Sequence, residues 1–500
     1  MKNLTKAICV FLAVIMSFTM VIPAFAADSK NIVCPEIYVH GFATGEIYAE
    51  KDGVSESISD IDTDALLGMV EETIVPAMLT FAVDGDAQKL AYAISGVIGT
   101  AFEDWFNNPD GSPKNNSGAK FVYPTASSIQ KTSRLSFMYD WRGDPIEIAA
   151  QLNDYIDYVL AATGCEKVAL SAHSLGSVII LSYISIYGDD KVMGIVFDTP
   201  AINGLTSVGE LFCGKAYFKE EAVATIFKTL FGYTEYEELL SSIVDIFTMA
   251  GINGSMSDFL NDAYDEVGAI VMEETLFPLF GSWLSVWAMV PDEYIEEVME
   301  CSFDSGVYAE DYDALKVRVQ EYNEKVRADK TQTLLDFDVD GKIAVISRYG
   351  YNSVPVTEEW GILSDTVIET RSSSLGATTA PVGEILSEEY LKDKDMKYIS
   401  PDKTIDASTC LFPDKTWFIK DSNHHENKVT AKYYSEFLFS EEEVTCETSS
   451  LSRFMLYDRE NNMLVEDSSE PVVAEKPTVF RRVFNFIKAL INKLLELLGK

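Results

Sequence analysis

Residues 167–187 read KVALSAHSLGSVIILSYISIY, and this stretch decides the fold. An apolar run typical of a buried strand passes, within a few residues, into an apolar run long enough for a helix. Ser174 lies at the bend between them, with the small residues Ala172 and Gly176 two positions away on either side. A strand that turns sharply into a helix lifts such a hydroxyl above the sheet edge, where N–H groups of the helix N-terminus face it. Although serine is also a common helix N-cap, the flanking strand and helix favour Ser174 as a nucleophile.

Strand and helix patterns alternate on both sides of this stretch. Strands are expected at residues 34–40, 134–141, 167–172, 192–198, 342–349 and 416–420, and helices at 145–163 and 175–187. Continuous apolar strands that alternate with helices indicate an α/β fold with a mostly parallel sheet. Residues 207–330 break this alternation, because they combine helical periodicity with many aromatic and Met residues and no strand pattern. We interpret them as a large helical cap above the sheet.

The N-terminal segment has the pattern of a secretory signal peptide. Lys2 and Lys6 flank the start of an almost wholly apolar run at 7–22, and Ala24-Phe25-Ala26 has the small-x-small pattern of a cleavage site. The apolar run is short for a membrane span. We therefore expect cleavage near Ala26 and a secreted protein, either extracellular or associated with the cell envelope.

A basic amphipathic helix is expected at the other end of the chain. Residues 476–500 place apolar side chains on one helical face, and Arg481, Arg482, Lys488 and Lys493 mark the polar side. Such a helix can lie in a lipid–water interface with its apolar face buried. The pattern fits membrane or cell-surface association through this helix, or alternatively its docking on the protein body.

These patterns divide the chain into six segments. We expect a signal peptide at 1–26, the two parts of the core at 27–206 and 331–445, the cap at 207–330, an extension and linker at 446–475, and the amphipathic helix at 476–500.

The composition excludes one class of partner. The chain has 79 Asp and Glu residues against 39 Lys and Arg, which gives a formal net charge of -40. So acidic a surface repels phosphate backbones, and we expect no nucleic-acid binding. A hydrophobic content of 47% over this length is ample for a large folded core.

Six cysteines follow the expected cleavage site, at positions 34, 165, 213, 301, 410 and 446. An even number in an exported protein permits disulfides, but the spacing does not give their pairing. Because the spacings are wide and contain no C-x-x-C pair, we expect no metal site. No cofactor is expected either.

Several motifs carry a resemblance to known lipases. Ala172–Gly176, with Ala in place of the usual first Gly, resembles the nucleophile elbow of small bacterial lipases. Tyr139-Asp140-Trp141-Arg142 is similar to an element of the lecithin:cholesterol acyltransferase-like lipases. Residues 199–204 resemble the segment where the cap of that group begins, and residues 287–291 the segment where it returns. The resemblance covers residues 34–205 well and the rest by fewer motifs, and it implies an α/β-hydrolase fold.

Acyl transfer requires two N–H donors that face the carbonyl oxygen as it gains charge. One is expected from the backbone of Leu175, directly after the nucleophile. His40-Gly41-Phe42 resembles the lipase His-Gly-x turn, and this resemblance implies that Phe42 donates the second N–H and that its ring lines the acyl pocket. His40 itself is expected to be structural.

The general base is expected among four histidines. His40 lies in the oxyanion turn and His173 adjoins the nucleophile, which leaves His424 and His425. Both follow the apolar strand at 416–420, and a loop after the last core strand is where this fold places its histidine, in the chain order Ser, Asp, His. We prefer His424 because its loop is shorter. A metal-binding histidine pair lacks other suitable ligands nearby.

The acid is expected after the strand at 342–349, where it would hold the histidine in one tautomer. Asp365 lies in a turn that resembles the Gly-Asp-x-Val turn of lipases, although Ser364 stands where Gly is usual. Asp402 and Asp406 are lesser candidates.

The expected function is therefore that of a serine carboxylic-ester hydrolase, a lipase or esterase. It would form an acyl-enzyme on Ser174 and, because its cap is rich in aromatic residues, would act on hydrophobic acyl esters or lipids. Two alternatives stay open: an acyltransferase that uses the same triad, and a catalytically silent hydrolase-like protein that binds lipid or cell envelope.

Overall fold

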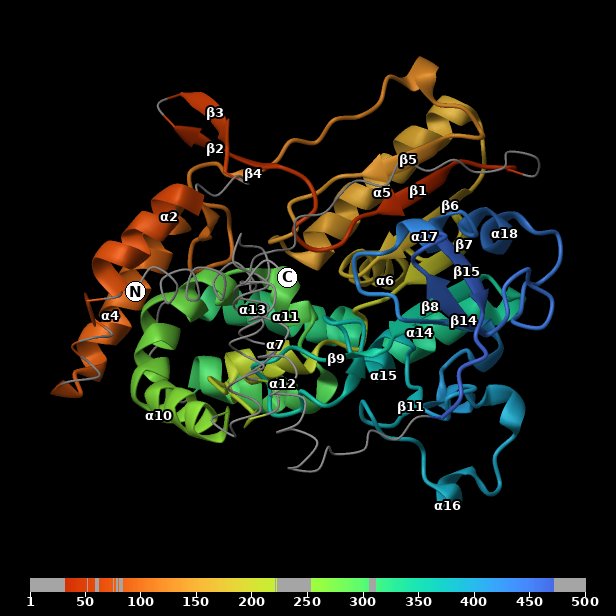
Figure 1. Ribbon diagram of the computed structural model, residues 1–500. Coiled ribbons are helices and arrows are strands. Elements are labelled where there is room, and N and C mark those ends of the chain that lie inside the picture. The colour runs from red at the N-terminus through yellow and green to blue at the C-terminus, as the bar shows by residue number, and fades with distance from the viewer. Residues whose placement is uncertain are drawn as a thin grey trace, which may run out of the picture.

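The computed structural model describes residues 32–471, apart from 52, 59–62, 75, 78, 79, 81–83, 221, 223–252 and 305–311. Its centre is an eight-stranded sheet in which every pairing is parallel except that of the edge strand β15 (Figure 1). The order across the sheet is β15-β14-β13-β8-β7-β6-β1-β5. The expected α/β fold class with a mostly parallel central sheet is thereby confirmed.

Six of the eight strands of this sheet correspond to expected apolar runs, and β14 and β15 do not. In chain order they are β1 (Glu36–Val39), β5 (Arg134–Phe137), β6 (Val168–His173), β7 (Val192–Asp198), β8 (Ile343–Tyr349), β13 (Thr416–Lys420), β14 (Phe454–Asp458) and β15 (Met463–Glu466). The strand expected at 134–141 ends at Phe137, because Asp140 forms a turn there: its carbonyl accepts the N–H of Gly143 at 3.0 Å. Within the segment expected as an extension and linker, β14 and β15 belong to the central sheet.

Alternate residues of the strands face two different hydrophobic layers, as the period of two requires. One layer packs the sheet against α5 (Pro145–Thr163) and α6 (Gly176–Tyr187), through residues that include Ile37, Val39, Leu170, Ile195 and Val345. The other packs it against α17 (Lys428–Ala431) and α18 (Tyr434–Phe439), through residues that include Tyr38, Ala169, Val196, Ile346 and Trp417. The sheet is thus covered on both faces.

The N-terminal half carries further elements before α5. They are β2 (Ile47–Lys51), β3 (Val54–Ser57), α2 (Thr63–Met69), η1 (Val70–Ile74), α4 (Ala87–Ala101), η2 (Glu103–Trp105), β4 (Gly118–Ala119) and η3 (Ala126–Ser128). β2, β3 and β4 form a small separate sheet that the sequence patterns did not predict.

The segment between β7 and β8 is helical in its described parts and lies to one side of the sheet (Figure 1). Its helices are α7 (Thr206–Phe212), α10 (Asn253–Val271), η4 (Met272–Gly281), α11 (Leu284–Ala288), α12 (Asp292–Met299), η5 (Glu300–Asp304), α13 (Asp313–Tyr322), η6 (Asn323–Arg327), α14 (Lys330–Phe337) and η7 (Asp338–Asp340). The start and the return of this segment cross at Gly204, where a Cβ atom would lie 2.6 Å from the backbone nitrogen of Pro291. With a φ of 78°, this position requires glycine.

Short elements follow β8 and connect it to β13. They are β9 (Tyr351–Asn352), β10 (Leu363–Ser364), α15 (Thr370–Ser373), β11 (Thr378–Thr379), α16 (Glu388–Leu391), η8 (Met396–Tyr398), β12 (Ile405–Asp406), η9 (Ala407–Thr409) and η10 (Pro413–Lys415). No helix in the described part of the chain combines the length and apolarity that crossing a membrane requires. The expected signal peptide and the expected C-terminal helix lie outside the described residues.

Candidate active site

Ser174 occupies a sharp bend between β6 and α6, at the centre of the sheet. Its φ of 55° lies in the left-handed region, which non-glycine residues seldom adopt. The bend is held by close packing behind it, because a Cβ atom on Gly176 would lie 2.3 Å from the carbonyl oxygen of Val39. The small residue two positions after the serine therefore lets α6 start directly against the end of β1. The strand-to-helix geometry that a nucleophile elbow requires is present.

The turn after β1 lies against this bend. A Cβ atom on Gly41 would be 3.0 Å from Cβ of Ser174 and 3.2 Å from Nδ1 of His173. Glycine at position 41 thus lets the turn His40-Gly41-Phe42 approach the serine. The hydroxyl of Tyr139 donates to the carbonyl of His40 at 2.6 Å and fixes the turn from below. Burial lowers the pKa of His40 to about 4, so this imidazole is neutral.

Asp365 and His424 form a buried pair. Nδ1 of His424 lies 2.7 Å from Oδ2 of Asp365, and the backbone N–H of His424 donates to the carbonyl of Asp365 at 2.8 Å. The other carboxylate oxygen of Asp365 accepts the N–H groups of Val367 at 2.9 Å and Ile368 at 2.7 Å. Burial alone would raise the pKa of Asp365, but the imidazole and these N–H groups outweigh it and lower the pKa. The carboxylate is therefore ionised and accepts a hydrogen bond from the Nδ1–H of His424.

This pair lies beside the serine bend. His424 follows β13 and Asp365 follows β10 in the connection after β8, so both loops leave the carboxyl ends of strands near β6. Nε2 of His173, the residue before Ser174, lies 2.9 Å from the carbonyl oxygen of His424. The rings of His173 and His424 have their centroids 4.6 Å apart. The loop that carries His424 is thus tied to the residue preceding the serine.

His173 is the contact that sequence reasoning missed. Burial and the neighbouring His424 hold its pKa well below the ordinary value, so the ring is neutral and its Nε2 carries the proton that it donates. In the sequence, its position next to Ser174 is the one signal that points to this contact.

Ser174 is 6% exposed, and its hydroxyl makes no hydrogen bond with any residue that the structure describes. Within the same described residues, Nε2 of His424 and the backbone N–H of Leu175 also have no partner. A base–nucleophile hydrogen bond commonly tightens only when substrate binds. At or near the serine bend, the described residues thus include a hydroxyl, an imidazole nitrogen and a backbone N–H that make no hydrogen bond. Acyl transfer uses these three kinds of group as nucleophile, base and oxyanion donor.

The remaining sequence candidates have other surroundings. His425 is exposed, and its ring stands at 85° to that of His424. Asp402 pairs with Lys420 at 2.6 Å, and Asp406 pairs with Lys394 at 2.9 Å. Of the candidates for base and acid, the structure joins His424 with Asp365.

Aromatic side chains wall the side of the site next to Phe42. The ring centroid of Phe42 lies 4.5 Å from that of Trp141 and 6.0 Å from that of Trp283. Trp105 packs against both indoles, at 5.3 and 6.3 Å. Because Trp283 belongs to the segment between β7 and β8, this wall joins the core to the helices above it. Arg142, in the element expected to mark a lipase, is fully buried and pairs with Asp140 at 2.8 Å.

A buried ion pair lies behind the site. Arg348 on β8 binds Asp198 at the end of β7, and both side chains are inaccessible to solvent. The hydroxyls of Thr430 and Tyr434 also donate to Asp198. The network connects β7 and β8 to the helices that follow the His424 loop.

Comparisons with known proteins add little. No family model matches the chain, and no curated protein matches it. One similar solved structure is the crystal structure of a Tle4–Tli4 complex, which is 11% identical, with a TM-score of 0.25 over 63% of this chain and 74% of that chain. So weak a similarity says nothing about activity, and the fold assignment depends on the strand order and its connections.

Proposed function

We propose that the protein is a serine hydrolase that cleaves carboxylic esters of hydrophobic acyl groups, as a lipase or esterase does. In this proposal Ser174 is the nucleophile, His424 the general base, and Asp365 the acid that orients it. The backbone N–H groups of Phe42 and Leu175 form the oxyanion hole.

One observation carries the proposal: the Asp365–His424 pair contacts His173, the residue directly before a serine held at φ 55° in a strand-to-helix bend. A neutral imidazole whose Nδ1–H is held by a carboxylate presents the lone pair of Nε2, which is the form that accepts a hydroxyl proton. The contact between His173 and the carbonyl of His424 supports the placement of that ring beside Ser174.

The proposed reaction has two halves. His424 takes the hydroxyl proton of Ser174 as the oxygen attacks the acyl carbon, and the tetrahedral oxyanion is stabilised by the two N–H groups. The protonated imidazole then gives its proton to the departing alcohol, which leaves an acyl-enzyme. Water, activated by the same imidazole, releases the acid and restores the serine.

The aromatic wall around Phe42 supports the choice of substrate. Phe42 is its partly exposed ring and offers an apolar surface next to the turn that contacts Ser174, while the buried Trp141 and Trp283 support it from behind. The division into core and cap, export with cleavage near Ala26, and association with membrane or envelope through 476–500 belong to the same proposal. They depend on the sequence patterns alone.

A fluorophosphonate probe tests the proposal directly, because it reacts with activated serines. We expect the full chain to be labelled and p-nitrophenyl esters to be hydrolysed, with both activities lost in Ser174→Ala. Ser177→Ala is the matched control, since Ser177 is a buried serine of α6 whose hydroxyl is already engaged by the carbonyl of Ser174 at 2.6 Å. Labelling that persists in Ser174→Ala would refute the assignment.

A further inference from the structure

The six cysteines after residue 26 lie as three neighbouring pairs, and each pair joins positions far apart in the sequence. All six are free thiols in the structure, and the pairs are Cys34 with Cys165, Cys213 with Cys301, and Cys410 with Cys446. No cysteine of the six is left over. An arrangement of this kind needs a common explanation.

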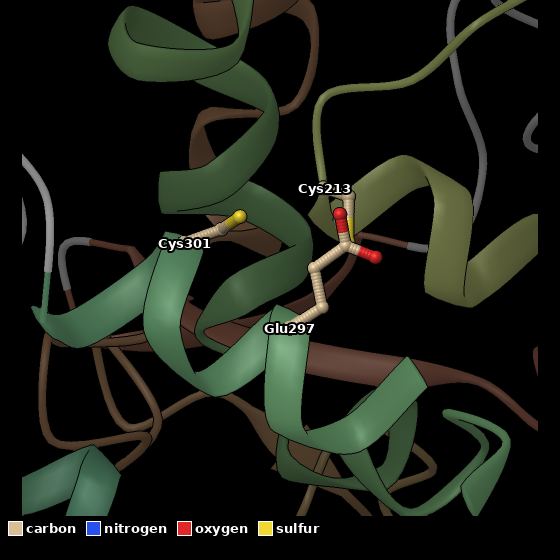
Figure 2. Close-up of side chains that lie close together, drawn as sticks. All are labelled: Cys213, Glu297 and Cys301. Carbon is tan, nitrogen blue, oxygen red and sulfur yellow. The ribbon is translucent and has the colours of Figure 1, made fainter. Parts of the chain in front are cut away.

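Cys213 and Cys301 face each other in the cap. Cys213 directly follows α7, and Cys301 lies in η5, one turn beyond Glu297 of α12. Figure 2 shows the three side chains converging, and their sulfur and oxygen atoms lie within 4.8 Å of one another. An S–S bond is about 2.0 Å long, so the gap to close is at most about 2.8 Å. A change of χ1 rotamer moves a cysteine sulfur by about that amount.

Cys34 and Cys165 precede adjacent strands. β1 and β6 run parallel with Glu36 opposite Ala169, so the two cysteines lie at the same amino-terminal edge of the sheet. Both side chains pack into the hydrophobic layer on the α18 face. Burial raises the pKa of Cys34 to about 12, and the nearby Cys165 adds to the shift.

Cys410 and Cys446 meet at the start of β13. The sulfur of Cys446 lies 3.3 Å from the carbonyl oxygen of Thr416, and the side chain of the same threonine influences the pKa of Cys410. The backbone N–H of Cys446 donates to the carbonyl of Asp414 at 2.8 Å, which anchors the segment after α18 beside this strand.

We propose that these six residues form three disulfide bonds, Cys34–Cys165, Cys213–Cys301 and Cys410–Cys446, once the chain is exported. In each, two thiols give up two protons and two electrons as the S–S bond forms. The acceptor is the disulfide of a thiol–disulfide oxidoreductase, which is reduced to two thiols. The Cys213–Cys301 bond ties α7, at the start of the cap, to η5. The proposal is independent of the hydrolase activity.

A metal site at Cys213, Glu297 and Cys301 explains the structure less well. Lys215 already holds the carboxylate of Glu297 at 2.7 Å. This is also the one group of possible metal ligands found in the part of the chain that the structure describes, so the other two cysteine pairs have no comparable third ligand. Disulfides account for all six cysteines, whereas a metal accounts for two.

Digestion after glutamate tests the pairing, because it places each cysteine in a separate peptide. The full chain is secreted into an oxidising compartment, denatured, alkylated without reduction and digested. We expect three linked species: 27–36 with 148–166, 211–220 with 301–310, and 390–426 with 444–447. Each should separate into two alkylatable peptides after reduction.

The double variant Cys213→Ser/Cys301→Ser should lose the second species and keep the other two. Its melting temperature should fall by a few degrees Celsius, because the crosslink restricts the unfolded chain. The matched control is the same double variant and the wild type, both made in a reducing compartment. There we expect no linked species and the same melting temperature for the two proteins. Alkylation of Cys213 and Cys301 without reduction would overturn the cap disulfide. It would also be overturned if the protein held one equivalent of zinc per chain and removal of the zinc by a chelator exposed both thiols. Linked species of any other pairing would overturn the proposal as a whole.

Discussion

The substitution Asp365→Asn isolates the role of one buried proton. In the structure, Oδ1 of Asp365 accepts two backbone N–H groups, and Oδ2 faces Nδ1 of His424 at 2.7 Å. An asparagine in this place keeps its carbonyl oxygen on the two backbone donors, because its amino group cannot accept from them. The amino group then faces Nδ1 and, as a donor, requires the tautomer of His424 that carries its proton on Nε2. That tautomer cannot accept the proton of Ser174.

The expected loss follows from the wrong tautomer. In a serine triad this change lowers kcat by about 10⁴. At about 1.4 kcal/mol for each factor of ten, this corresponds to roughly 5.5 kcal/mol of lost transition-state stabilisation. KM should change little, because the carboxylate is fully buried and does not contact substrate.

Hydrolysis of p-nitrophenyl esters at saturating substrate measures this loss, and near-ultraviolet circular dichroism shows whether the variant is folded. Asp402→Asn is the matched control, since Asp402 is another buried aspartate, paired with Lys420. The control should keep kcat within a fewfold of wild type. A folded Asp365→Asn variant that retains kcat within tenfold of wild type would refute the tautomer argument and the assignment of the acid.

Three further predictions concern packing and charge. Gly176→Ala places a Cβ atom 2.3 Å from the carbonyl oxygen of Val39. It should lower kcat, and it should lower the free energy of unfolding, measured in urea, by about 1–3 kcal/mol. An unchanged kcat would contradict the packing of the bend. Arg348→Met leaves the buried carboxylate of Asp198 without its cationic partner, with the hydroxyls of Thr430 and Tyr434 as its remaining donors. This change should lower the free energy of unfolding by about 3–5 kcal/mol, and an unchanged free energy would contradict a stabilising role for the pair. Burial raises the pKa of Glu210 to about 7, so the folded protein binds a proton that the unfolded chain has released, and stability falls as pH rises from about 4.5 to about 7. Glu210→Gln should therefore raise the free energy of unfolding by up to about 3 kcal/mol at about pH 8 and leave it unchanged at about pH 4. An equal change in the free energy of unfolding at both pH values would exclude the raised pKa of Glu210 as the cause.

Much of the core could be predicted because its signals are local. The apolar runs of β6, β7, β8 and β13 are continuous, and a fully buried parallel strand requires this. The Ser174 bend was predictable for the same reason, since strand, serine and helix follow one another within a few residues. By contrast, β2 pairs with β3 across a short turn and with β4 across a segment that contains α2 and α4, and its mixed sequence carries no strong alternation.

The choice between His424 and His425 depends on contacts that sequence cannot supply. Neighbouring residues of a loop point in different directions, and which one faces Asp365 depends on how the loop is held. In the structure the backbone N–H of His424 donates to the carbonyl of Asp365, and the N–H of His425 donates to the side chain of Asn423. The first of these bonds joins residues about sixty positions apart, and the second joins close neighbours. The length of the loop, on which the sequence argument relied, does not determine either bond.

The strand ends around the site share a feature that explains why their loops can converge. β6, β7, β8 and β13 are neighbours in the sheet, and each is followed directly by a residue of left-handed φ: Ser174 at 55°, Thr199 at 46°, Gly350 at 118° and Asp421 at 54°. Such a residue turns the chain sharply at the end of its strand. Four adjacent loops can therefore leave the same edge of the sheet without steric overlap. Three of these residues are not glycine, and each such conformation costs on the order of 1–3 kcal/mol. The fourth is glycine because its φ of 118° strains any L side chain, and a Cβ atom there would also lie 3.1 Å from the backbone nitrogen of Asp421 on the neighbouring strand end. Part of the backbone strain of the described chain therefore lies at the edge where the nucleophile, acid and base of the proposed triad meet, and the packing of the sheet beneath holds it there.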